Sequence, residues 1–173
     1  MSKTIQAVTT FSASDHYTAK TGRFTEGRQG WAYSGTLFRN GQKIATFDEY
    51  GDGAMMRVDW INTAEEAALR DWYHRIKPGK HPYYEGGFAI ETVVNRSLDE
   101  ADLRRQINKR VFVVVPGDVR NGGKSAMLTT KVLPKDHVLP AASRVQERQP
   151  DDVVLNLLPF DAAFALYMTL NVA

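Results

Sequence analysis

The stretch VFVVVPGDVRNGGKS, Val111 to Ser125, decides the fold class, because it is either a strand that runs into a phosphate-binding loop or one half of a β-hairpin. A phosphate-binding loop of the form G-x-x-x-x-G-K-[ST] has a fixed spacing, since successive backbone N–H groups wrap around the phosphates. Gly123, Lys124 and Ser125 fit the second half of that motif, but Asp118 occupies the position of the first glycine. An acid there would face the phosphates, so the spacing argues against a nucleotide-binding loop.

The segment that follows, AMLTTKVLP, also argues against such a loop. A phosphate-binding loop leads directly into a helix, and the N-terminus of that helix binds the anion. Two adjacent threonines and a valine favour a strand, and Pro134 is the ninth and last residue of the segment. We therefore predict an antiparallel hairpin of Arg110 to Pro116 and Ala126 to Leu133. Its connection is polar and rich in glycine, which suits a turn.

Composition indicates one ordinary globular domain over residues 1–173, with 43% hydrophobic and 24% charged residues. The net charge of +2, from 22 basic and 20 acidic residues, is too balanced to predict general attraction to nucleic acid or membranes. The absence of cysteine excludes disulfides, thiol catalysis and cysteine-ligated metal sites.

The N-terminus, MSKTIQAVTTFSASD, has no apolar signal region, and no run in the chain approaches the roughly 20 apolar residues that span a membrane. We therefore expect a cytoplasmic protein without a membrane partner.

The N-terminal half predicts mainly strands. Thr4 to Phe11 is rich in β-branched residues and predicts a first strand, whereas Ser12 to Arg28 is polar and predicts a long loop. Trp31 to Phe38 and Gln42 to Phe47 flank Arg39-Asn40-Gly41. An Asn-Gly pair between alternating apolar residues favours a type I′ hairpin, since both residues tolerate positive φ.

Three helices are predicted from capping signals and apolar spacing. Asn62 or Thr63 can cap a helix that ends near Ile76, before Pro78-Gly79. Ser97, with Glu100 three residues later, forms a capping box for a second helix to about Lys109.

The segment before this capping box, Phe88 to Val94, could be strand or helix. Asp136 to Arg148 is weakly helical and is interrupted by Pro140, whereas Pro159 starts a clear amphipathic helix that should pack on the sheet. The fold we predict is a single α+β domain, with an antiparallel sheet built from two hairpins plus an N-terminal strand and packed with about three helices.

Three stretches carry a resemblance: GTLFRNGQKIATFDEYGDGAMMRVDW (Gly35 to Trp60), KRVFVVV (Lys109 to Val115) and VLNLLPFDAAFALY (Val154 to Tyr167). In this order they resemble a diffuse group of small uncharacterised proteins of bacteriophage and plasmid genomes. That group has a glycine pair where this chain has Gly53 followed by Ala54. The group has no established activity, so no catalytic residue can be carried over from it. The resemblance implies a protein of a mobile genetic element that acts in the cytoplasm of a bacterial host.

The loop DEYGDGAMMRVD, Asp48 to Asp59, partly imitates a calcium-binding loop. Tyr50 and Met56 occupy ligand positions, however, and the preceding segment is predicted to be a strand rather than a helix. The loop is therefore a solvated turn or a binding loop. Adaptable methionines favour contacts, so the candidate contact residues here are Asp52, Met55 and Met56.

The segment DWYHRIKPGKHPYYEGG, Asp71 to Gly87, mixes aromatic and basic residues, a combination typical of protein interfaces and of nucleic-acid binding. The structural alternative is that Trp72 and one tyrosine belong to the core, and that the basic residues complement a helix dipole. The candidate partner-binding residues are Trp72, Tyr73, His74, Arg75, Lys77, Lys80, His81, Tyr83 and Tyr84.

Catalytic motifs are absent from the sequence. The four histidines, His16, His74, His81 and His137, show no i, i+4 pair and no H-E-x-x-H pattern, and there is no G-x-S-x-G elbow. We therefore expect no metal, no cofactor and no catalytic residue that the sequence identifies.

The leading hypothesis is a non-catalytic binding protein of a phage or mobile element that engages a host macromolecule, which we expect to be a host protein or protein complex. Inhibition of a bacterial defence complex is one purpose that such binding would serve. One alternative is a small enzyme that acts on a nucleotide or a modified protein through dispersed residues such as His16, His74 or His137. The other is local binding of nucleic acid, whose affinity would fall steeply with salt.

Overall fold

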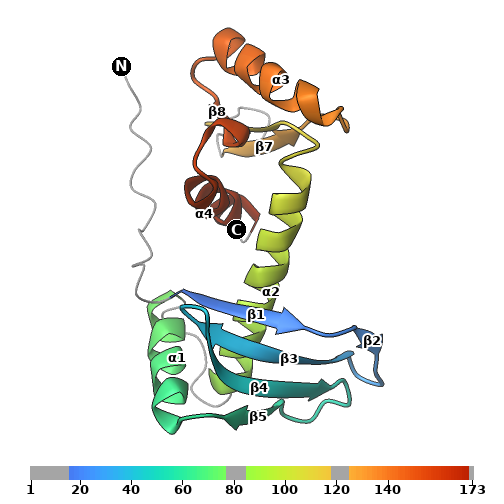
Figure 1. Cartoon of the computed structure of the whole chain (residues 1–173), viewed down its shortest axis with the longest axis vertical. Coiled ribbons are helices and arrows are strands. Elements are labelled where there is room, and N and C mark those ends of the chain that lie inside the picture. Colours follow the sequence, from blue (N-terminus) through green and yellow to red (C-terminus); the bar gives the residue numbers. More distant parts are fainter. Residues whose placement is uncertain (1–15, 77–84, 118–124, 172–173) are drawn as a thin grey trace. The chain divides into compact units, whose positions relative to one another are not determined.

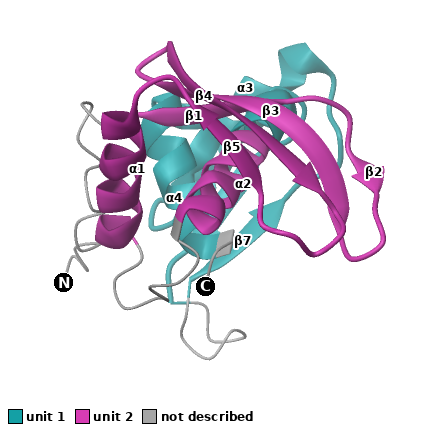
Figure 2. Ribbon diagram, turned by 90° about the horizontal axis from the view of Figure 1, so that it is seen from below, with its two compact units in different colours: residues 1–8, 100–173 teal, residues 9–99 magenta. Residues whose placement is uncertain are grey.

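The computed structural model describes residues 16–76, 85–117 and 125–171 (Figure 1). Within these residues the chain has four α-helices and two antiparallel sheets, which confirms the predicted α+β class. The chain divides into two compact units (Figure 2). We call residues 9–99 the N-terminal unit and residues 100–173 with 1–8 the C-terminal unit. The predicted first strand, Thr4 to Phe11, lies outside the described residues, and the single domain stays a prediction.

The N-terminal unit contains a five-stranded antiparallel sheet with the order β1-β3-β4-β5, in which β2 also pairs with β3. The predicted Asn-Gly hairpin is confirmed, because Asn40 has a φ of 52° and Gly41 a φ of 80° between β3 and β4. The strands are β1 (Tyr17–Thr21), β2 (Thr25–Glu26), β3 (Trp31–Arg39), β4 (Gln42–Tyr50) and β5 (Arg57–Trp60).

The predicted loop from Ser12 to Arg28 is wrong where the structure describes it, because it contains β1 and β2. Strand β1 pairs along β3 from Tyr17 opposite Arg39 to Thr21 opposite Gly35. The apolar residues of β1 that pack in the core are Tyr17, which is buried, and Ala19, which is partly buried. Two apolar residues are too few for a visible alternation, so this strand depends on its tertiary partner.

One face of this sheet packs on two helices, α1 (Thr63–Ile76) and α2 (Glu85–Gln106). Helix α1 begins and ends as predicted, and the N–H of Ala64 donates to Oδ1 of Asn62 at 2.8 Å as a cap. The core between sheet and helices contains Tyr17, Leu37, Ile44, Ala45, Phe47, Leu69, Trp72, Tyr73, Ala89, Ile90, Val93 and Val94.

The predicted capping role of Ser97 is wrong, because Ser97 lies inside α2. Its hydroxyl donates to the carbonyl of Val93 at 2.8 Å and accepts the N–H of Ala19 at 2.9 Å. The hydroxyl of Ser97 therefore accepts a hydrogen bond from a backbone N–H of β1 and does not cap the start of a helix. Phe88 to Val94, left open between strand and helix, is helical.

The C-terminal unit contains a three-stranded sheet with the order β7-β6-β8. The predicted hairpin is confirmed by the antiparallel pairing of β6 and β7, and a strand follows the connection instead of the helix of a phosphate-binding loop. The two predicted hairpins thus belong to different sheets. The elements are β6 (Phe112–Val115), β7 (Ala126–Thr129), α3 (Lys135–Arg148), β8 (Val153–Val154), η3 (Leu155–Leu157) and α4 (Phe160–Asn171).

Alternate residues of β6 and its preceding residue face two different cores. Phe112 and Val114 pack with α4 and with Leu103 of α2, whereas Val111 and Val113 pack with α3. Helix α4 thus begins after Pro159 and packs on the sheet as predicted. Helix α3 runs through Pro140, in contrast to the predicted interruption. Pro140 lies in the second turn, where a missing N–H removes a single hydrogen bond.

Candidate binding cleft

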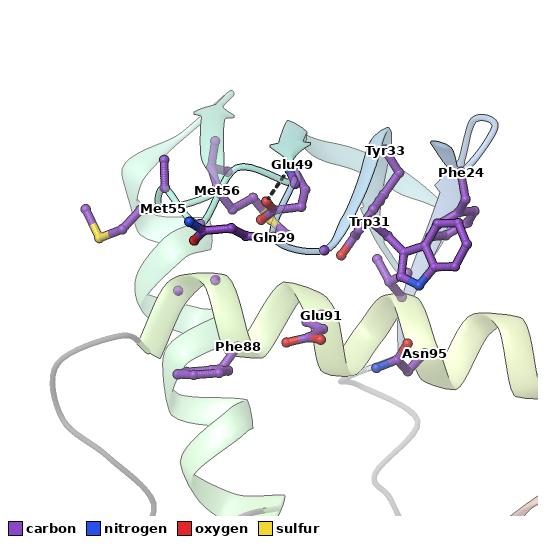
Figure 3. Close-up of a pocket in the computed structure, with 18 of the residues that line it drawn as sticks. Phe24, Gln29, Trp31, Tyr33, Glu49, Met55, Met56, Phe88, Glu91 and Asn95 are labelled. Atoms are coloured by element: carbon purple, nitrogen blue, oxygen red, sulfur yellow. Dashed lines mark hydrogen bonds between the residues drawn. The ribbon is translucent and has the colours of Figure 1, made fainter. Parts of the chain in front are cut away.

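A cavity of about 960 Å³ lies in the N-terminal unit between the sheet and the first half of α2 (Figure 3). We call it the cleft. Residues 16–76 supply its sheet side and its loops, and α2 supplies the other side. The lining residues are Phe24, Gln29, Gly30, Trp31, Tyr33, Glu49, Gly51, Gly53, Ala54, Met55, Met56, Val58, Trp60, Glu66, Arg70, Gly86, Gly87, Phe88, Glu91, Val94 and Asn95.

The periodicity of the two elements places the polar groups of the cleft. Tyr33 of β3 is the cross-strand partner of Glu49 in β4, so both side chains lie on the face of the sheet that the helices cover. Phe88, Glu91 and Asn95 are three and four residues apart on α2 and therefore share one side of that helix. Figure 3 shows these three side chains following one another along α2.

Close backbone contacts fix the loops at one end of the cleft. Gly51 has a φ of 63°, and a Cβ at Gly27 would lie 2.6 Å from the carbonyl oxygen of Gly51. The N–H of Gln29 donates to that same oxygen at 2.7 Å. The N–H of Gly51 donates to Oε1 of Glu49 at 3.0 Å, which orients this carboxylate within the cleft.

Aromatic and apolar side chains form much of the wall and rim. The rings of Phe24 and Tyr33 lie 4.7 Å apart at 30°, and Tyr33 meets the buried ring of Phe47 edge-on at 6.2 Å. Trp31 is 60% exposed, Met55 75% and Phe88 45%. Large apolar side chains thus remain in contact with solvent around the cleft.

The electrostatic character of the cleft is acidic. Burial raises the pKa of Tyr33 to about 12, and the negative charges of Glu91 and Glu49 add to this effect. Among the described lining residues, Arg70 is the one basic side chain, and it forms an ion pair with Glu66 at 3.3 Å. Glu49 and Glu91 therefore dominate the field beside Tyr33.

The functional groups in the cleft include carboxylates, a phenol and amides beside aromatic and apolar surface. The described lining residues include no histidine, serine, threonine, cysteine or lysine, so nucleophiles of those types and an imidazole base do not line the described part of the cleft. His16 and His74 are exposed elsewhere in the N-terminal unit, and His137 is exposed on α3. Across the described parts of the chain, no three His, Asp or Glu side chains gather to hold a metal ion.

The predicted contact residues have different positions. Met55 and Met56 line the cleft, and Asp52 lies in the same turn, where its Oδ1 accepts the N–H of Ala54 at 2.9 Å. Trp72 and Tyr73 are buried in the core, so they cannot contact a partner at the surface. Their burial supports the alternative that Trp72 and one tyrosine of this segment are core residues.

Of the other predicted contact residues, the structure describes two. His74 and Arg75 are exposed on α1. The rest of the predicted set lies outside the described residues: Lys77, Lys80, His81, Tyr83 and Tyr84.

Several lining residues were not found from the sequence. Glu49 and Tyr33 lie in the predicted hairpin, but their pairing across it requires the register of the strands. Phe88, Glu91 and Asn95 show their common side only once this segment is known to be a helix. The sequence does contain one signal of the cleft in Trp31, because this aromatic residue lies at the start of a predicted strand beside Gly30.

No α-helix in the described parts of the chain combines the length and the apolar character needed to cross a membrane. No family model, no curated protein and no solved structure matches the chain.

Proposed function

We propose that this chain is a non-catalytic binding protein that engages a partner macromolecule through the cleft and its rim. The observation that supports this most is the exposure of Trp31, Met55 and Phe88 around one cavity. Aromatic side chains and methionine are enriched in protein interfaces, where burial of a few such residues supplies most of the binding energy.

A protein is favoured over nucleic acid as the partner by the charges of the cleft. Glu49 and Glu91 would repel phosphates, and Arg70 is held in an ion pair with Glu66. Nucleic-acid binding instead depends on basic residues that neutralise phosphates.

The class of partner that we propose rests on the resemblance to phage and plasmid proteins. That resemblance implies a bacterial host, and we propose a host protein or complex as the partner. Our specific hypothesis is that the chain inhibits a bacterial defence complex. Purification of the chain together with its partner would test this hypothesis.

The experiment is an affinity capture with the tagged full chain from nuclease-treated bacterial lysate. The captured proteins are identified by mass spectrometry, and the eluate's ultraviolet absorbance ratio reports nucleic acid. Variants Trp31→Ala and Phe88→Ala should weaken binding of the identified partner about tenfold or more, because such anchors often supply about 2 kcal/mol. Leu139→Ala is the matched control, since Leu139 is 60% exposed on α3 of the C-terminal unit.

A partner bound in stoichiometric amount, and lost only with the cleft variants, would support the proposal. Equal capture by the wild-type chain and both cleft variants would overturn the assignment to the cleft. Capture of nucleic acid alone would replace it with the nucleic-acid alternative.

A further inference from the structure

We propose that the cleft receives a positively charged side chain of the partner polypeptide, a lysine ammonium or an arginine guanidinium, with Glu49 and Glu91 as counter-ions. This inference rests on the proposed function and specifies the chemistry of the group that the cleft recognises. It is carried by the combination of a cavity, its charge and its aromatic wall.

The charge of the cleft selects a cation. Glu49 approaches from the sheet and Glu91 from α2, so negative charge is present on both sides (Figure 3). One oxygen of Glu49 already accepts the N–H of Gly51, which fixes the carboxylate before a ligand arrives. Charge-assisted hydrogen bonds from an ammonium or a guanidinium to such carboxylates are the strong ones in proteins.

The walls of the cleft suit the remainder of such a side chain. Phe24 and Tyr33 pack against each other at 4.7 Å, and Trp31 is exposed beside them. Aromatic faces attract cations, and the methylene groups of lysine and arginine pack well on apolar surfaces. Met55 and Met56 add adaptable apolar contact at the other end.

The size of the cleft favours a polypeptide over a small free cation. Its lining along α2 extends from Gly86 to Asn95, which is about 14 Å at 1.5 Å per residue. The exposed rim side chains Trp31, Met55 and Phe88 would stay in water if only an ammonium group were bound. A chain that follows the cleft would cover them while one of its basic side chains enters.

The test measures binding of three synthetic eight-residue peptides, each capped at both ends, with glycine alternating with lysine, arginine or glutamate. Tryptophan fluorescence reports binding, because Trp31 and Trp60 line the cleft, and calorimetry gives the affinity. We expect the lysine or arginine peptide to bind and the glutamate peptide to give no response.

The variants Glu49→Gln and Glu91→Gln keep the shape of the side chain and remove its charge. Each should weaken binding of the basic peptide by about tenfold or more. The matched control is Glu147→Gln, an exposed glutamate of α3, which should leave the affinity unchanged. Circular dichroism of every variant confirms that it is folded.

Several results would overturn the inference. These are no binding of either basic peptide, equal binding by the Glu→Gln variants, or preference for the glutamate peptide. Equal affinity for spermidine and for the lysine peptide would also overturn it, because the cleft would then be a site for a small cation.

The outcome is separable from that of the proposed function. Binding of the basic peptide without any partner in the lysate capture would leave the cation inference standing and contradict the proposed function. A captured partner that depends on Trp31 but not on Glu49 or Glu91 would do the reverse.

Discussion

At the scale of single residues, Tyr33 is a titratable group whose surroundings in the cleft shift its pKa. Its pKa is raised to about 12 by burial and by Glu91 and Glu49, whereas an ordinary tyrosine ionises near pH 10. The unfolded chain therefore loses this proton near pH 10 and the folded chain near pH 12. Between these values the folded state binds more protons, so the free energy of unfolding should fall as pH rises.

We predict that Tyr33→Phe removes the contribution of this phenol to the fall in the free energy of unfolding between about pH 10 and about pH 12. The ultraviolet titration of wild type minus Tyr33→Phe isolates one phenol from the other tyrosines. In the same measurement Glu49→Gln and Glu91→Gln should lower the pKa of Tyr33, while Glu147→Gln should not change it. Ionisation of Tyr33 near pH 10 would show that the phenol is not placed as described.

Asn156 makes three hydrogen bonds in the C-terminal unit. Its Oδ1 accepts the N–H of Phe112 at 2.8 Å, and its Nδ2 donates to the carbonyls of Ile107 at 2.7 Å and Arg110 at 2.8 Å. One amide thus connects the segment after α2, the start of β6 and η3. Among uncharged side chains, only the carboxamides of asparagine and glutamine present an acceptor and two N–H donors, and glutamine is one methylene longer.

Asn156→Ala should lower the free energy of unfolding by about 3 kcal/mol, because partly buried backbone groups lose their partners. Chemical denaturation measures this loss. Asn108→Ala is the control, because Asn108 is exposed and its Nδ2 donates to the carbonyl of Arg104 at 3.0 Å, so its loss should be below about 1 kcal/mol. Similar effects of the two substitutions would contradict the anchoring role of Asn156.

At the scale of elements, the ring of Phe47 in β4 can lie against Gly35 of β3 because Gly35 lacks a side chain. A Cβ at this position would overlap the ring of Phe47 and lie 2.8 Å from the backbone oxygen of Lys20 in β1. The ring can move only by losing core contacts, and the backbone oxygen belongs to the paired strand. Gly35 therefore lets Phe47, its cross-strand partner, lie flat over the sheet.

Gly35→Ala should reduce the free energy of unfolding by about 1–3 kcal/mol through overpacking. Gly86→Ala is the matched control, since Gly86 lies in α2 and a Cβ there would meet no atom within 4 Å. That substitution should be neutral or stabilise by up to about 1 kcal/mol, because alanine is the better helix former. Thermal unfolding of both variants tests the difference, and a stable Gly35→Ala protein would refute it.

The elements that the sequence predicts correctly are those with local signals. The Asn40-Gly41 turn, the Asn62 cap and Pro159 each act on adjacent residues, so their effect is visible without knowledge of the fold. Ser97 looked like a cap for the same reason, but its hydroxyl serves Ala19, 78 residues earlier in the chain. Such a contact between distant segments has no local pattern.

The cleft was predictable only in part for the same physical reason. Met55 and Met56 stand out as apolar residues in a polar turn, and they do line the cleft. Glu49 and Glu91 come from a strand and a helix and gain their significance only when the fold brings them near Tyr33. Trp72 is an aromatic residue near basic residues, and this pattern is equally typical of a buried core residue of α1 and of an interface residue. The structure shows that Trp72 is buried.

At the scale of the whole molecule, the two compact units share one helix. Ile90 and Val93 of α2 belong to the core of the N-terminal unit, and Leu103 of the same helix belongs to a core of the C-terminal unit. A helix is stabilised mainly by the packing of its apolar side chains, so each unit depends on a segment that the other also holds. This sharing predicts cooperative unfolding of the chain.

The positions of the tryptophans allow this cooperativity to be measured directly. Trp31, Trp60 and Trp72 all lie in the N-terminal unit, so tryptophan fluorescence reports that unit, whereas far-ultraviolet circular dichroism reports helices of both. We predict coincident denaturation midpoints by the two methods, as a single cooperative domain requires. Asn156→Ala, which acts in the C-terminal unit, should then lower the fluorescence midpoint as well. If that substitution moved only part of the dichroism signal, the chain would contain two domains that unfold independently.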